Sequence, residues 1–555
     1  MTTNDVSFFI RIKRIEFVNF RNIEKGEIDF PNAEIYEYVE GNPSILGLYG
    51  QNGSGKSSVI MALGILKDAL SGNTIGNNYQ SCIRYGCDRC TLRFSFSLYG
   101  KMYNSAGKAI IDRDHSNHNE VFYEFDIVKN LIDDSEAILN ENEIEKPANV
   151  LHIENEQIKI RIASEDGTII YPKQIIINTR KSRAKKKTFL FGSQMKQDVF
   201  TNYDPETEQK YRELLAVSTA RSQSFVFNPK VIELMMNSVE SVLEDDEDVQ
   251  KLYKYDANFK APNSLNELRN TVEHLKSNDE EALSILMAMS LLFITPIMLI
   301  DSLHRYGRDY LQVIDTVTTG LTNINTKLPL LLWTSVPNDG VYYYRVPLNM
   351  DGPTTVKESS FLHVKSSLNA VSDVLCKIVP GMRLNLVDLG VHPSSKNVEV
   401  HSFDIISQRE EVSIPLKYES DGIRRIVSIM SLLIAAYNDA SFTIAIDEID
   451  SGIFEYLLGE LLSILSDSVK GQFVFTSHNL RPLEVLPAKY LCFTTTNPDK
   501  RFVKIPNRGN SNLRDTYFRS IILNTQKEQV YNPTDRHEIE MAFYKAGHEE
   551  VTDYE

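Results

Sequence analysis

Residues 50–57 have the types and spacing needed for chemistry on phosphate. They follow the pattern G-x-x-x-x-G-K-S, with the lysine at Lys56 and the serine at Ser57. Glycines let backbone N–H groups curve around phosphate oxygens, and the N-terminus of a following helix adds the positive end of its dipole. In such a loop the lysine reaches the β- and γ-phosphates and the serine hydroxyl binds Mg²⁺. The other residues expected to contact the nucleotide are Asn52, Gly53, Ser54, Gly55 and Ser58.

Three side chains much later in the chain could complete a phosphate-cleaving site. Asp447 and Glu448 end an apolar run, and His478 ends another one 478 − 448 = 30 residues further on. A carboxylate after a buried strand can hold Mg²⁺, mostly through water, and the next carboxylate can orient or deprotonate an attacking water. A histidine after the neighbouring parallel strand could sense the γ-phosphate, although a lone histidine there is usually structural. We therefore predict catalytic roles for Lys56, Glu448 and His478, and metal-binding roles for Ser57 and Asp447.

The flanking sequence predicts the elements that position these groups. The apolar run 44–49 has the pattern of a buried strand, and residues 58–66 have helical spacing. Ser420 and Gly422 open a further predicted helix, 426–437, whose N-terminus could bind an anion. Strand, glycine loop and helix in this order are the context that a P-loop requires. The predicted fold class is α/β.

Apolar spacing divides the chain into four expected regions. Residues 1–204 and 328–500 alternate as strands and helices and form two halves of one nucleotide-binding unit. Between them, residues 205–327 have helical spacing without a heptad repeat, which predicts a compact helical insertion. Residues 501–555 form a helical C-terminal extension that could bind a partner.

The charge of the 555-residue chain limits its partners. The net charge of −16 opposes general nucleic-acid binding, so such a contact needs a local basic patch. The densest basic run, residues 180–187, is either a solvated loop or a contact to a nucleic-acid backbone. Both interpretations stay open.

The cysteines and one apolar segment indicate in which cellular compartment the protein is expected. Five cysteines do not make a disulfide framework, which suits the cytoplasm. Cys82, Cys87 and Cys90 could supply three ligands to an iron–sulfur or zinc site, but without an evident fourth ligand ordinary thiols are favoured. Residues 282–300 carry no charge and could span a bilayer. A span there would separate residues 50–57 from the later carboxylates, so we expect a buried helix kinked near Pro296 and no membrane contact.

In combination and order, these motifs resemble the ABC-type ATPase head of the branch that includes SMC-like, RecF-like and OLD-family proteins. The matching residues are Asn19-Phe20-Arg21, the P-loop, the signature motif Ser420-Asp421-Gly422, the pair Asp447-Glu448, and His478. The resemblance implies ATP and Mg²⁺ as cofactors, a mixed sheet with a P-loop core plus an antiparallel sheet, and Arg21 near the nucleotide.

The resemblance also implies how copies of the chain assemble. In that superfamily the signature motif of one subunit closes the nucleotide site of the other, which implies a head-to-head dimer or higher homo-oligomer. Ser420 and Gly422 would then contact ATP held by a second copy. The glutamine-bearing loop of the superfamily is not identified, and Gln174, Gln194 and Gln197 remain open as candidates.

The C-terminal region narrows the resemblance to PtuA-like ATPases of Septu and retron anti-phage systems. Residues 512–519 and 536–547 look like the end of those proteins, residues 447–455 also fit, and the likeness is looser over the helical insertion. The resemblance implies an ATP hydrolase that controls the assembly and activity of a separate HNH-type nuclease, PtuB. In retron versions a reverse transcriptase and its RNA-linked single-stranded DNA join the assembly.

The sequence is less consistent with three other functions. OLD nucleases carry a C-terminal Toprim domain, but only 555 − 478 = 77 residues follow His478 and none forms a D-x-D motif, so we do not expect this chain to cut nucleic acid itself. An SMC/RecF-like DNA-repair ATPase that clamps DNA is the main alternative, and it predicts DNA binding through residues 180–187. A scaffold that binds ATP without hydrolysing it is disfavoured by Glu448.

Overall fold

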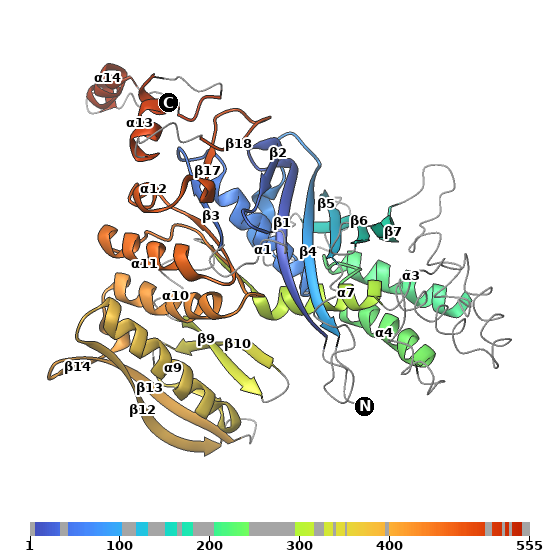
Figure 1. Ribbon diagram of the computed structural model, residues 1–555, viewed down its shortest axis with the longest axis horizontal. Coiled ribbons are helices and arrows are strands. Elements are labelled where there is room, and N and C mark those ends of the chain that lie inside the picture. The colour runs from blue at the N-terminus through green and yellow to red at the C-terminus, as the bar shows by residue number, and fades with distance from the viewer. Residues whose placement is uncertain are drawn as a thin grey trace, which may run out of the picture.

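The computed structural model shows an α/β core, an antiparallel sheet crossing it, and a further lobe built on α9 (Figure 1). The residues that it describes are 6–33, 43–102, 118–130, 150–163, 169–180, 205–243, 295–315, 327–336, 340–349, 352–393, 399–505, 513–523, 528–531 and 535–546. The predicted α/β class, with a mixed sheet around residues 50–57 and a separate antiparallel sheet, is confirmed.

Six strands form the central sheet that carries the candidate site. Their order is β18-β17-β3-β16-β15-β8, and each pairs in parallel with its neighbour except β18, which is antiparallel to β17. The strands are β3 (Ser44–Tyr49), β8 (Leu311–Ile314), β15 (Thr443–Ile446), β16 (Gln472–Thr476), β17 (Leu491–Thr494) and β18 (Phe502–Val503). β3, β15, β16 and β17 are buried throughout, as parallel strands with both faces covered require. Their carboxyl ends lie at one edge, where the following loops meet.

One strand of this sheet was not predicted from the sequence. β8 lies inside 205–327, where we expect helices, yet it pairs in parallel with β15. It follows α7 (Thr295–Arg305) and the π-helical turn η6 (Tyr306–Tyr310) without a break. Four residues are too few for strand periodicity to be recognised. The helical pattern therefore ends before β8, and residues 311–314 belong to the core.

The second sheet is antiparallel, with the order β2-β1-β4-β5-β6-β7. Its strands are β1 (Val6–Phe20), β2 (Ile23–Asp29), β4 (Arg89–Met102), β5 (His118–Asn130), β6 (Val150–Ala163) and β7 (Ile169–Asn178). The strands expected within residues 1–204 are thus present in the described ranges. Alternating residues of β4, among them Phe94 and Phe96, are buried in the core shared with α1.

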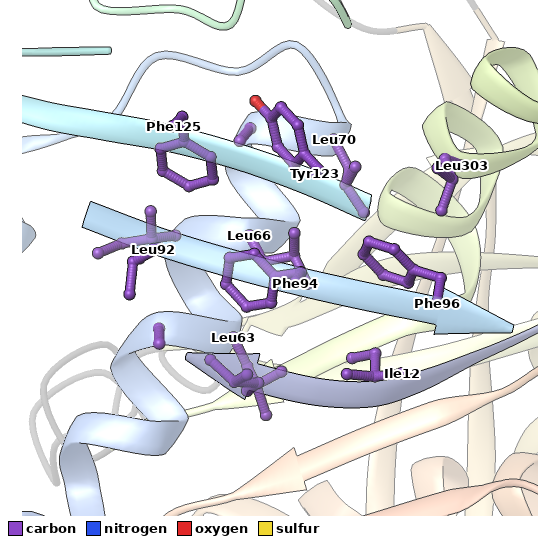
Figure 2. Packing of buried hydrophobic residues seen from close by; sticks show 14 of the residues in the cluster. Ile12, Leu63, Leu66, Leu70, Leu92, Phe94, Phe96, Tyr123, Phe125 and Leu303 are labelled. Atoms are coloured by element: carbon purple, nitrogen blue, oxygen red, sulfur yellow. The ribbon is translucent and has the colours of Figure 1, made fainter. Parts of the chain in front are cut away.

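Helix α1 (Lys56–Leu70) packs against this antiparallel sheet (Figure 2). Leu63, Leu66 and Leu70 are fully buried and lie beside Phe94 and Phe96 of β4. Each buried side chain of this kind stabilises the fold by about 1.5–3 kcal/mol. This packing fixes the direction of α1, and therefore the place of its N-terminus at the candidate site.

A side-chain amide ties the two sheets to each other. Gln472, fully buried at the start of β16, accepts a hydrogen bond from Ile12 N at 2.7 Å and donates one to Ile12 O at 2.9 Å. The register of β1 with β4 shifts between Ile12 and Arg14, at the same point of β1. The side-chain amide of Gln472 bonds to the backbone of Ile12 there, as a neighbouring strand would. The sheet that carries Arg21 is thereby held to the sheet that leads to His478.

A further lobe precedes the signature motif. It contains the hairpin β9–β10 (Lys327–Val336, Gly340–Asn349) and a sheet in which β13 (Glu399–Arg409) pairs with β11 (Thr354–Lys357), β12 (Met382–Pro393) and β14 (Val412–Pro415). Helix α9 (Glu358–Ile378) covers one face of that sheet through Val364, Leu368 and Val371. The short helix η7 (Leu416–Tyr418) then leads into α10 (Asp421–Asn438).

The remaining described elements are mostly helical. They are η2 (Asn77–Cys82), α3 (Pro205–Ala220), α4 (Pro229–Leu243), α11 (Glu455–Ser468), α12 (Pro482–Val485), η8 (Ala488–Tyr490), α13 (Leu513–Leu523) and α14 (Arg536–Ala546). α3 and α4 agree with the helices expected there, whereas 244–294, which hold most of the uncharged segment 282–300, lie outside the described residues. Pro296 stands in the first turn of α7. Across the described ranges, no helix has the length and apolarity that crossing a membrane needs.

Candidate active site

The glycine loop has the backbone conformation that a phosphate-binding loop needs. Gly50, Gly53 and Gly55 have φ angles of 150°, 75° and 107°, a region that side chains with a Cβ rarely adopt. A Cβ on Gly50 would also lie 1.9 Å from Thr494 Oγ1 of β17. Gly55 directly precedes α1, and no side chain caps that helix, so its first N–H groups remain directed at the loop. The predicted strand, loop and helix are thus present.

Lys56 and Ser54 hold the loop in shape from within. Lys56 is 5% exposed, and its ammonium group donates to Gly50 O at 2.8 Å and Gln51 O at 3.2 Å. Burial lowers the pKa of Lys56, while the carboxylates of Asp447 and Glu448 oppose that shift. Ser54 N also donates to Gln51 O, at 3.1 Å. The ammonium group therefore lies inside the curve of the loop, where a phosphate would be bound.

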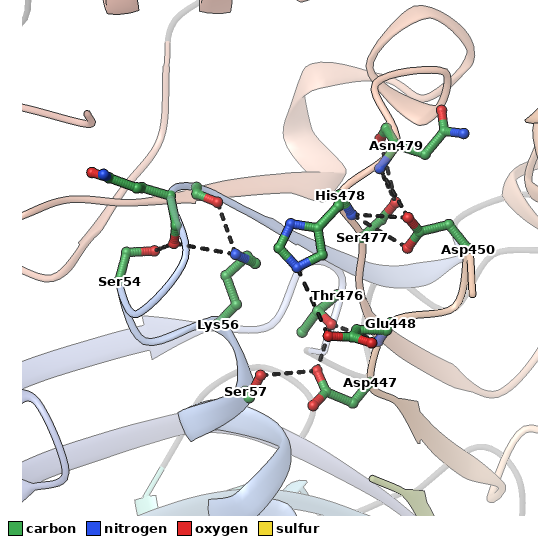
Figure 3. A network of polar contacts seen from close by, with 12 residues as sticks. Ser54, Lys56, Ser57, Asp447, Glu448, Asp450, Thr476, Ser477, His478 and Asn479 are labelled. Carbon is green, nitrogen blue, oxygen red and sulfur yellow. Dashed lines mark hydrogen bonds and ion pairs between the residues drawn. The ribbon is translucent and has the colours of Figure 1, made fainter. Parts of the chain in front are cut away.

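The two predicted metal ligands contact each other. The Ser57 hydroxyl, in the first turn of α1, donates to Asp447 Oδ1 at 3.2 Å (Figure 3). Thr476 Oγ1, at the end of β16, donates to the same oxygen at 2.5 Å, and Arg425 Nη2 donates to Asp447 O at 3.1 Å. Asp447 is 2% exposed. A hydroxyl and a buried carboxylate at this separation match the protein ligands that Mg²⁺ uses when phosphates and water complete its coordination.

Glu448 and His478 face each other at the edge of the site. His478 Nε2 lies 3.9 Å from Glu448 Oε1, and both side chains are more than two-fifths exposed, at 43% and 44% (Figure 3). Glu448 has a φ of 48°, a left-handed conformation that costs a non-glycine residue about 1 kcal/mol or more. Its N–H donates to Thr476 Oγ1 at 2.8 Å, which holds this conformation. The strained backbone turns the carboxylate toward solvent, while Asp447 stays buried beside it.

Asp450 is a positioning residue that the sequence analysis did not assign. Its carboxylate accepts hydrogen bonds from the backbone N–H of His478 at 3.2 Å and of Asn479 at 3.1 Å (Figure 3). The loop after β15 thereby fixes the loop after β16. An acidic residue shortly after Glu448 was visible in the sequence, but no local pattern showed that it contacts amides some thirty residues away.

Arg21, which the resemblance implies to be near the nucleotide, stands in the turn between β1 and β2. It has a φ of 51°, and its N–H donates to Cys82 O at 2.8 Å. Burial lowers the pKa of the Arg21 guanidinium, and the charge of Asp447 opposes this shift, which places the two groups in electrostatic contact. The neighbouring Asn22 was not predicted, although its amide donates to Gly53 O and accepts from Ser58 Oγ at 3.4 Å.

The signature residues stand at the N-terminus of α10. The Ser420 hydroxyl caps that helix by accepting from Ile423 N at 3.4 Å, and in the described part of the chain it makes no hydrogen bond to the glycine loop. Gly422 touches the loop that carries Asp450, because a Cβ on Gly422 would lie 2.3 Å from Gly452 O. Gly452 itself has a φ of 75°. Two glycines thus let two backbones meet where any side chain would separate them.

The other candidate residues are the three cysteines and the three glutamines, and the structure does not bring those that it describes to this site. Cys82 and Cys90 are buried, and a hydrogen bond between their thiols together with burial raises the pKa of Cys90. Across the described residues, no group of three His, Cys, Asp or Glu side chains is placed to hold a metal ion. Gln174 lies in β7, whereas Gln194 and Gln197 lie outside the described residues.

The basic run is described only at its first residue. Arg180 donates to Glu124 Oε1 at 2.7 Å, so its positive charge is paired with a carboxylate of the antiparallel sheet. Residues 181–187 lie outside the described residues.

The sequence profile of the AAA ATPase domain family matches residues 11–481. No curated protein matches the chain. Among solved structures, the chain is similar to the Smc head domain of Pyrococcus furiosus, which was solved with an extended coiled coil and bound to the C-terminal domain of ScpA. The two are 12% identical, with a TM-score of 0.33, and the match covers 89% of this chain and 96% of that one. The recombination mediator RecF with ATP is similar at 14% identity and a TM-score of 0.28, over 85% and 94%.

Proposed function

This chain belongs to the AAA ATPase domain family, and on that premise we propose that it is an ATP hydrolase whose active site is completed by a second copy of the chain. One observation carries the proposal. The first turn of α1 and the ends of β15 and β16 bring Ser57 to Asp447, and Glu448 to His478. These are the groups that cleavage of a γ-phosphate by water requires.

The described residues fit MgATP. The backbone N–H groups of the glycine loop and of the first turn of α1 would bind the phosphates, with Lys56 between them. Ser57 and Asp447 would hold Mg²⁺, which would neutralise charge on the β- and γ-phosphates. Arg21 adds a second cation on the same side, as its electrostatic contact with Asp447 indicates.

Glu448 and His478 supply the hydrolytic step. The Glu448 carboxylate is exposed, so it can accept the proton of an attacking water. His478 would hold the γ-phosphate and orient Glu448 across the 3.9 Å gap. Asp450 keeps His478 in place through the backbone.

Several exposed groups support a second copy as the missing part of the site. Ser420 is exposed at the N-terminus of α10, where its hydroxyl and the helix dipole could meet an anion. The aromatic side chains of Tyr418, Phe454 and Tyr456 are exposed on either side of the Gly422–Gly452 contact. Exposed aromatic groups beside an anion site are typical of the core of a protein interface. Two copies facing each other would cover these groups and bring Ser420 to the partner's phosphates.

Mixing two inactive variants tests whether the site is composite. Lys56→Met removes the phosphate-binding cation, and Ser420→Arg blocks the surface offered to the second copy. In a mixed dimer, one site combines the intact loop of one copy with the intact signature of the other. Random exchange should therefore restore about a quarter of wild-type ATP turnover, since about half of the dimers are mixed and each has one intact site. Turnover of the mixture equal to the mean of the separate variants would contradict the composite site.

We extend the proposal to a partner nuclease on the basis of the PtuA-like motifs. ATP binding and hydrolysis would control the assembly and activity of an HNH-type nuclease, in a Septu system or, with a reverse transcriptase and its RNA-linked DNA, in a retron. The chain would not cut nucleic acid itself. Support comes from α14, which has no buried residue and exposes Ile539, Phe543 and Tyr544, a surface suited to a protein partner.

Mass measurement of the complex purified from its native host, with and without MgATP, tests this extension. We expect a nuclease subunit in the complex and a change of assembly mass on adding ATP, and no such change with Lys56→Met. Nuclease activity that persists in the chain freed of every partner, or an assembly mass indifferent to ATP, would contradict the gating role.

A further inference from the structure

Arg501 is a buried cation beside the glycine loop that the proposed ATPase chemistry does not use. It precedes β18, is 6% exposed, and donates from Nη1 to Thr495 O at 2.7 Å and from Nη2 to Asn22 O. Its side chain also packs against the loop, since a Cβ on Gly55 would lie 3.4 Å from Arg501 Cγ. Arg501 therefore lies against both Asn22 and Gly55.

Asn22 passes this contact to the loop. Its side-chain Nδ2 donates to Gly53 O, and its side-chain Oδ1 accepts from Ser58 Oγ at 3.4 Å. Gly53 and Ser58 both lie in the segment whose N–H groups would bind phosphate. A change in the position of Arg501 would thus shift Asn22 and, with it, the curvature of the loop.

The charge of Arg501 is not balanced by an acid. In the described part of the chain its partners are carbonyl groups, and its Nε–H has no acceptor. Burial and the nearby charge of Arg84 both lower the pKa of Arg501. A buried cation without a carboxylate is costly, and a bound phosphate group would offset part of that cost by attraction. If Arg501 served only to fill space, its buried positive charge would add a cost and no benefit.

The turn that carries Arg501 is held by three other parts of the chain. Thr494 contacts Ser54 Oγ and donates to Tyr49 O at 3.1 Å, next to the loop. Glu24 N of β2 donates to Pro498 O at 3.0 Å. On the C-terminal side, Thr496 N donates to Gln529 O at 2.8 Å.

Glu528 adds two contacts to the C-terminal attachment. Its carboxylate accepts from Asn497 Nδ2 at 2.9 Å and pairs with Lys500 at 3.3 Å. The turn 494–501 therefore contacts both the glycine loop and residues 528–531 of the C-terminal extension.

We propose that Arg501 is a positioning residue for ATP, which holds the glycine loop through Asn22 and links it to residues 528–531 through the turn 494–501. This inference rests on the proposed ATPase function and deepens it. Arg501 acts on the loop and not on the attacking water, so it affects ATP binding in the ground state and the transition state alike. ATP binding should in turn stiffen the turn and the C-terminal segment attached to it.

Steady-state kinetics of full-chain variants test the first part. Arg501→Ala is expected to raise KM for ATP about tenfold and to change kcat by less than about threefold, the pattern of lost uniform binding. Arg501→Lys should regain part of the affinity, and Asn22→Ala should raise KM in the same direction, which covers the case in which Arg501→Ala fails to fold. Arg514→Ala, which removes an exposed arginine that pairs with Glu484 in the same region, is the matched control and should leave KM unchanged.

Hydrogen–deuterium exchange tests the link to the C-terminal extension. MgATP should slow amide exchange in peptides that cover 494–501 and 528–531 in the wild type. In Arg501→Lys at saturating ATP, the start of α1 should stay protected while the protection of 528–531 shrinks. Unchanged KM in Arg501→Ala and Asn22→Ala, or no effect of ATP on 528–531 in the wild type, would overturn the inference alone. Failure of the unaltered chain to bind ATP would overturn the ATPase proposal with it.

Discussion

Replacing Glu448 with glutamine is expected to lower kcat for ATP hydrolysis about 10²–10³-fold, the size of a general-base contribution. Glutamine keeps the shape of the side chain but cannot accept the proton of the attacking water. The backbone strain at residue 448 is held by Thr476 through the main-chain N–H, so the local geometry should survive the substitution. The dissociation constant for ATP should stay within about threefold, because the phosphates are bound by the glycine loop.

The Glu448→Gln variant should also accumulate ATP-bound dimers, since the closed state would no longer be released by hydrolysis. Light scattering measures the dimers and filter binding measures the retained nucleotide. Glu460→Gln is a matched control, because Glu460 is an exposed carboxylate of α11, twelve residues further on in the chain. Turnover of Glu448→Gln near the wild-type rate would remove Glu448 from the mechanism and favour another base.

Replacing Lys56 with methionine is expected to lower kcat/KM for ATP about 10²-fold or more, the value of a charged hydrogen-bond donor to a phosphate. Methionine fills a similar volume without the ammonium group. The variant loses the bonds to Gly50 O and Gln51 O but also the cost of burying a charge, so its melting temperature without nucleotide should change little. The rise in melting temperature that ATP gives the wild type should be absent.

Thermal shift with and without MgATP measures the Lys56 effect directly. Lys67→Met, in the last turn of the same helix, removes a lysine that donates to Gln312 Oε1 at 3.0 Å. That control should keep the ATP-induced shift. If Lys56→Met kept it as well, the glycine loop would not be the nucleotide site.

Local sequence patterns predicted the parts of the site that lie within one strand–loop–helix unit. Gly50 to Ser57 and the pair Asp447 and Glu448 carry their structural context on both sides, so their positions followed from periodicity and loop composition. The short distance from β15 to β16 also made the adjacency of His478 predictable. The α/β class followed from the same patterns.

The rest depended on contacts between distant segments. Asn22, Asp450 and Arg501 reach the site through hydrogen bonds to backbone atoms of distant segments, and no spacing rule marks such bonds in a sequence. β8 was missed because four residues directly after helical turns show no alternation. The meeting of Gly422 with Gly452 could not be inferred either, since each glycine alone is explained by a helix start or a turn.

The Gly422–Gly452 contact has a consequence for how two sites in one assembly would behave. Gly422 belongs to the surface that we propose faces a second copy, while Gly452 belongs to the loop whose Asp450 fixes the histidine of the chain's own site. With no side chain between the two backbones, neither can shift without the other. In a dimer assembled as we propose, nucleotide binding at one site would therefore shift the signature residues that close the other site, through main-chain atoms.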